Sequence, residues 1–157
     1  MHVKRIQMFN IIFKQNKDLS KNSKKVKQWQ SEHRIMANYA LKVVEHYEQN
    51  NLKKAKKELL KLQKISLHHL MDEDVTFFEL IGKAKDTQKD QAVVKAMAEF
   101  SKSFRDVKKA IFNFFDHYIT FENPLDTDFK ETLDVIINAL VQRIEFEETN
   151  LYALIDN

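Results

Sequence analysis

Two histidines and two glutamates could bind a cation together if the chain folds as helices. His69 and Glu73 are four residues apart, so an α-helix places them on one face. His33 and Glu147 each interrupt an otherwise apolar helical stripe elsewhere in the chain. Imidazole and carboxylate groups suit iron, manganese or zinc, and a helical bundle can hold a metal between facing helices. The pattern predicts a metal site formed by His33, His69, Glu73 and Glu147.

A second arrangement would satisfy the same buried groups without an ion. A polar side chain that is buried without a partner is costly, so each of the four needs one. Arg143 lies four residues before Glu147, on the flank of the same helical face. Its guanidinium could neutralise Glu147 and reach Glu73, forming a buried ion-pair network. The residues themselves leave both arrangements open.

Three breaks divide the chain into the helices that must position these residues. Asn50-Asn51 interrupts the first helical pattern, Gly82 the second, and Pro124 ends the third because proline cannot continue a helix. Asp126 or Asp128 can cap the last helix. We predict helices over residues 22–49, 52–81, 88–121 and 127–155.

Four long helices with short connections predict an all-α fold, an antiparallel up-down-up-down four-helix bundle. Residues 1–20 are expected to form an N-terminal arm or short helix of a single domain that spans residues 1–157. The third helix has an apolar stripe throughout, so it should contribute packing and no ligand. A hydrophobic pocket beside that helix would admit dioxygen or another small ligand.

Composition excludes several other classes of protein. The 157 residues include one Gly, one Pro and no Cys, which excludes all-β folds and cysteine-ligated metal sites. A net charge of +3 gives no indication of a nucleic-acid partner, and no apolar run is long enough for a membrane span. No nucleophilic Cys or glycine-rich phosphate loop is present, so we expect no enzyme. We expect a cytoplasmic protein.

The residues around the candidate ligands resemble the hemerythrin-like (HHE cation-binding) domain family. The similar blocks are EHRI at 32–35, HLMDED at 69–74 and RIEFEE at 143–148, the last followed by Leu151-Tyr152. The resemblance implies an up-down four-helix bundle, usually with a non-haem di-iron centre for oxygen binding, sensing or iron handling. It places His33, His69, Glu73 and Glu147 on ligand positions, whereas Arg143 stands where the family usually has His.

From this resemblance we expect a hemerythrin-like metal-binding protein that uses non-haem iron for oxygen or redox sensing or for iron handling. One ion, two ions or none are all compatible with a ligand set that contains Arg143.

A second resemblance is to the Rsd/AlgQ-type anti-sigma regulators, which are similar in length and share the bundle plan. They carry an Arg-x-x-x-Glu-Asp block late in the chain, similar to the segment from Arg143 to Glu148. This resemblance implies a metal-free bundle that acts as a regulator through a protein partner. Glu73 favours the first family, because the regulators lack a carboxylate at that position.

Overall fold

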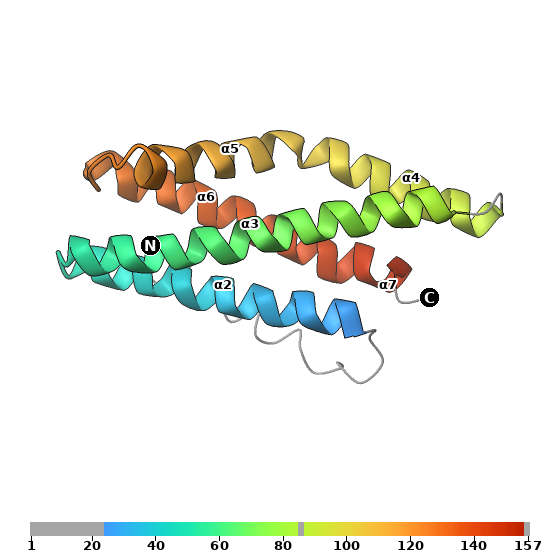
Figure 1. The fold of residues 1–157 in the computed structure, drawn as a ribbon, viewed down its shortest axis with the longest axis horizontal. Coiled ribbons are helices and arrows are strands. Elements are labelled where there is room, and N and C mark those ends of the chain that lie inside the picture. Colours follow the sequence, from blue (N-terminus) through green and yellow to red (C-terminus); the bar gives the residue numbers. More distant parts are fainter. Residues whose placement is uncertain (1–23, 85–86, 156–157) are drawn as a thin grey trace.

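The computed structural model describes residues 24–84 and 87–155 and is an all-α bundle, as the sequence predicts (Figure 1). Its first two long helices are α2 (Lys24–Glu48) and α3 (Leu52–Lys83), which pack side by side. The remaining elements are α4 (Gln88–Ser103), α5 (Arg105–Phe115), η2 (Asp116–Thr120), α6 (Thr127–Phe146), η3 (Glu147–Leu151) and α7 (Tyr152–Ile155). The predicted N-terminal arm, residues 1–20, lies outside the described residues.

The helix ends follow from the residues at the predicted breaks. Asn50 takes a left-handed backbone angle, φ 57°, which Asn tolerates better than most residues. The side chain of Asn51 then accepts a hydrogen bond from the Lys54 backbone N–H and caps α3. Asp126, rather than Asp128, caps α6, because its carboxylate accepts a hydrogen bond from the Phe129 backbone N–H.

Two predicted helices are less regular than the sequence suggested. The third, expected to be continuous over residues 88–121, is interrupted at Phe104 and ends in the π-helical turn η2. The fourth leaves α-helical geometry at Glu147, where the π-helical turn η3 begins, and resumes as α7 at Tyr152. Single π-helical turns inside α-helices are frequent at functional sites.

The core consists of two hydrophobic clusters with buried charged residues between them along the helices. The larger cluster includes Met36 of α2, Leu70 of α3 and Ile144 of α6. The smaller one contains Val26, Trp29, Phe77, Met97, Phe100, Leu151 and Tyr152. The charged residues that lie between the two clusters are therefore enclosed by apolar side chains. None of the helices in the described ranges is long and apolar enough to cross a membrane.

Candidate metal centre

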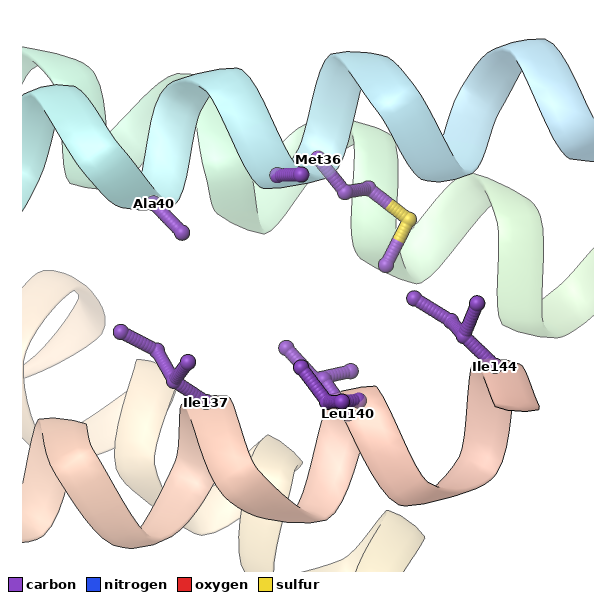
Figure 2. A pocket seen from close by; sticks show the side chains of 7 residues that line it. Met36, Ala40, Ile137, Leu140 and Ile144 are labelled. Atoms are coloured by element: carbon purple, nitrogen blue, oxygen red, sulfur yellow. The ribbon is translucent and has the colours of Figure 1, made fainter. Parts of the chain in front are cut away.

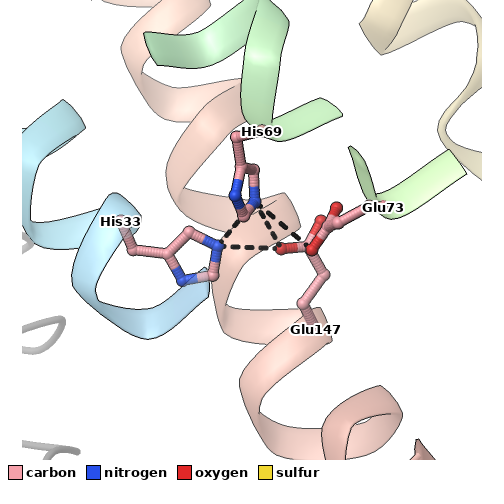
Figure 3. A group of neighbouring side chains, drawn as sticks. All are labelled: His33, His69, Glu73 and Glu147. Carbon is pink, nitrogen blue, oxygen red and sulfur yellow. Dashed lines mark hydrogen bonds and ion pairs between the residues drawn. The ribbon is translucent and has the colours of Figure 1, made fainter. Parts of the chain in front are cut away.

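The structure brings together the four residues that the sequence singled out (Figure 3). His33 comes from α2, His69 and Glu73 from α3, and Glu147 from the start of η3. One ligand atom of each lies within 4.8 Å of the others, and all four residues are at most 1% exposed. Two ligand atoms on one ion, each at about 2.1 Å from it, can be at most about 4.2 Å apart.

The individual contacts satisfy this limit. The Nε2 atom of His33 lies 3.0 Å from Nε2 of His69 and 3.1 Å from Oε2 of Glu147. The Nε2 atom of His69 lies 3.3 Å from Oε1 of Glu73 and 3.8 Å from Oε2 of Glu147. These four pairs of ligand atoms are therefore close enough to share one ion, and the full extent of the group, 4.8 Å, requires only a small inward shift of the side chains.

Each histidine is oriented by a carboxylate on the side of the ring that faces away from the cluster centre. Nδ1 of His33 lies 2.7 Å from Oε1 of Glu148, and Nδ1 of His69 lies 2.7 Å from Oε2 of Glu32. An ionised carboxylate only accepts hydrogen bonds, so both Nδ1 atoms carry the proton and donate it. This carboxylate–histidine arrangement is the one that supports metal-ligating histidines.

Because the protons are on Nδ1, the Nε2 atoms of both histidines are left with lone pairs that face the centre of the cluster. With the protons on Nδ1, two neutral imidazoles would point Nε2 lone pairs at each other across 3.0 Å. Carboxylate oxygens of Glu73 and Glu147 surround the same point. A positive charge at this point, from a metal ion or from an extra proton on an imidazole, makes this packing favourable.

Arg143 supplies one permanent positive charge to Glu73 and Glu147, on the side of their carboxylates that faces away from the two histidines. Its Nε donates to Oε1 of Glu147 at 2.7 Å, and its Nη2 donates to Oε2 of Glu73 at 3.2 Å. The guanidinium is buried, with its carbon 4.9 Å from the ring centre of Phe100 and 5.8 Å from that of Phe104. Both ion pairs considered from the sequence are thus present.

Tyr152 completes the cluster and was not predicted as part of it. Its hydroxyl donates to Oε1 of Glu73 at 2.8 Å and lies 3.2 Å from Nε2 of His33. On a regular α-helix, a residue five positions after Glu147 would be rotated by about 140° from it. The π-helical turn η3 removes that offset, and the Tyr152 hydroxyl lies 3.3 Å from Oε2 of Glu147.

The surrounding carboxylates raise the pKa of both histidines when no metal is present. Burial lowers the pKa of His33, but its hydrogen bonds with Glu147 and Glu148 outweigh burial, and the net shift is upward. For His69, burial is again outweighed by hydrogen bonds with Glu147, Glu32 and Glu73, which raise the pKa to about 11. In the metal-free protein, protons therefore take the place of a metal cation.

The two inner glutamates have opposite pKa shifts, although both are buried. Burial raises the pKa of Glu147, but hydrogen bonds from His33 and His69 and the charge of Arg143 hold it well below its usual range. Burial and repulsion from Glu147 raise the pKa of Glu73, and the neighbouring cations oppose this only in part. Burial and both carboxylate charges also hold the pKa of Tyr152 well above its usual value.

Other polar residues considered from the sequence lie outside the cluster. His68 is exposed, and His117 is exposed beside Asn123. Within the described residues, α4 and α5 contribute no His, Asp or Glu to the cluster. The residues that sequence reasoning missed are Glu32, Glu148 and Tyr152. The first two are direct neighbours of predicted ligands in the sequence, which was the only available signal for them.

Two hollows lined mostly by apolar side chains lie beside the third helix, as expected: one of about 280 Å³ whose lining includes Leu67 and Phe115, and one of about 190 Å³ whose lining includes Val93 and Met97. Neither is lined by a residue of the cluster.

A cavity of about 20 Å³ lies between α2 and α6 (Figure 2). Its lining includes Met36 and Ala37, one turn after His33, and Ile144, one turn before Glu147. A cavity of this volume has room for about one water-sized molecule.

Comparison with known proteins gives one match. The model of the Hemerythrin HHE cation binding domain matches residues 24–155. No curated protein and no solved structure matches the chain.

Proposed function

The chain belongs to the hemerythrin HHE cation-binding family, and on this premise we propose that its buried cluster binds non-haem iron. The observation that supports this most directly is the 3.0 Å approach of the Nε2 atoms of His33 and His69, each with its Nδ1 proton held by a carboxylate. Metal binding is implied by the family. The choice of iron, and its use in oxygen or redox sensing or in iron handling, are our proposals.

Each residue of the cluster has a role in this proposal. His33 and His69 offer imidazole nitrogens, while Glu73 and Glu147 offer carboxylate oxygens. Glu32 and Glu148 hold the imidazoles in the tautomer that a metal requires. Iron bound here would supply one-electron chemistry with dioxygen or another redox partner.

We propose a binding or sensing role rather than catalysis. Among the described residues, all four members of the cluster are at most 1% exposed, so a substrate of ordinary size cannot contact them. The apolar cavity between α2 and α6 is small, and it adjoins the helical turns that carry His33 and Glu147. A diatomic molecule such as dioxygen suits such a space better than a polar metabolite does.

Metal content per chain, measured by elemental analysis together with an ultraviolet–visible spectrum, tests the proposal. After anaerobic reconstitution with ferrous iron and desalting, we expect bound iron in the wild-type protein. His69→Ala should abolish it, because His69 contacts His33, Glu73 and Glu147. His68→Ala, which changes the exposed neighbouring histidine, is the matched control and should retain iron.

The alternative function is that of a metal-free bundle that acts as a regulator through a protein partner. The observation that favours it is Arg143, whose guanidinium already pairs with Glu73 and Glu147 without an ion. Reconstituted wild-type protein that contains no iron and has an unchanged melting temperature would contradict the metal proposal and favour this alternative.

A further inference from the structure

We propose that the centre holds a single metal ion and that the guanidinium of Arg143 acts as its permanent second cation. The inference rests on the proposed function, since it concerns how the same cluster binds metal. It goes further by assigning a site with one ion to a chain whose family usually holds two.

Both inner glutamates, Glu73 and Glu147, already bridge the histidine side and the arginine side of the cluster. Glu147 directs Oε1 to Nε of Arg143 and Oε2 to Nε2 of His33. Glu73 directs Oε2 to Nη2 of Arg143 and Oε1 to Nε2 of His69. Each carboxylate therefore directs one oxygen to the histidine side, where an ion would bind and where the Tyr152 hydroxyl also lies, and has its other oxygen paired with the guanidinium.

Among the described residues, the guanidinium side of the cluster offers no additional ligand for a second ion. Arginine keeps its proton in proteins and has no lone pair to donate to a metal. Behind its plane lie the rings of Phe100 and Phe104. The candidate ligand group among the described residues consists of His33, His69, Glu73 and Glu147, with no donor from the α4 or α5 side.

The charge of Arg143 also opposes a second ion. A second divalent ion beside these two carboxylates would lie next to a buried guanidinium that cannot lose its charge. Repulsion at such short range is strong, because little water is present to screen it. Arg143 would have to leave Glu147 and Glu73 before that ion could bind, and its buried position between them and two aromatic rings opposes this.

The stoichiometry of iron binding tests the inference. Wild-type protein is titrated anaerobically with ferrous iron, desalted, analysed for iron per chain and then oxidised for electron paramagnetic resonance. We expect about one iron per chain and an isolated high-spin ferric signal that accounts for it. Two irons per chain with loss of that signal through coupling between ions would overturn the inference while leaving the proposed function intact. No bound iron would instead contradict the proposed function.

Variants at residue 143 test the role of the guanidinium. Arg143→Lys keeps the charge and should still bind one iron. Arg143→His replaces the cation with a ligand four residues from Glu147 and should bind more than one. The matched control is Arg105→His, at an exposed position of α5, which should bind one. Circular dichroism verifies that each variant is folded, and a folded Arg143→His protein limited to one iron would contradict the role assigned to Arg143.

Discussion

Arg143 is the residue whose charge matters most when no ion is bound. It pairs with two buried carboxylates at once, and its side chain is almost completely enclosed. Such a pair adds little net stability compared with apolar packing, because both partners lose their hydration. Removal of one partner destabilises the fold strongly, because it leaves the other charge buried without a partner.

Arg143→Leu should therefore destabilise the metal-free protein by about 3–5 kcal/mol, because Glu73 and Glu147 lose their guanidinium partner. Denaturant unfolding in the presence of a chelator measures the change in the free energy of unfolding. Arg105→Leu is the matched control and should stay within about 0.5 kcal/mol of wild type, because residue 105 is exposed. A change at residue 143 no larger than in this control would contradict the network.

Residue types and spacing were enough to find the inner cluster but not its surroundings. His33 and Glu147 were recognisable because a charged or polar side chain interrupts an apolar stripe. Glu32 could not be found in this way, since a residue next to a buried one usually points to solvent on a helix. It is nevertheless 7% exposed, because its carboxylate turns toward His69 of the neighbouring helix. That contact depends on how α2 and α3 pack against each other.

At the level of the elements, the turn η3 decides which side chains of the last helix reach the cluster. Regular helical periodicity carries the buried stripe of the last helix from Glu147 to Leu151 and then Leu154. The wider π-helical turn keeps Leu151 buried, brings Tyr152 inward and leaves Leu154 36% exposed. Sequence periodicity predicted the existence of the helix well, but a one-residue irregularity falls outside any fixed period.

Deletion of Asn150, an exposed residue of η3, should preserve iron binding. The deletion moves the tyrosine to a position four residues after Glu147, where a regular α-helix also places it on the same face. Iron per chain and helical content by circular dichroism are the two measurements. Replacement of Asn150 by Ala serves as the control for the lost side chain. Loss of iron from a deletion variant with normal helical content would contradict this account of η3.

At the scale of the whole molecule, protons and metal compete for the same buried nitrogens. The pKa of His69 is raised from 6.5 to about 11 in the metal-free fold. A raised pKa in the folded state stabilises the protein fully below pH 6.5, and this stabilisation is lost as the pH rises toward 11. A metal ion requires the unprotonated nitrogen, so metal binding becomes more favourable as the pH rises.

We therefore expect opposite pH trends with and without metal. In a chelator, the free energy of unfolding should fall between about pH 6 and about pH 9, because the unfolded chain releases a proton that the folded protein still holds. Over that range, the rise in melting temperature caused by added zinc or iron should increase. His69→Ala should weaken both trends, whereas His68→Ala should keep them. A stability of the chelated protein that increased with pH would contradict the assignment.

Because the metal centre is enclosed between two hydrophobic clusters, a metal ion should enter and leave it slowly. His33, His69, Glu73 and Glu147 are each at most 1% exposed, so an ion cannot enter or leave while the helices remain packed. Local opening must come first, and its frequency sets an upper limit on the rate. Glu147, Glu148 and Tyr152 lie together on η3 and the start of α7. Detachment of this one segment would remove three groups from the centre at once, so the frequency with which it opens would limit how fast a bound ion leaves.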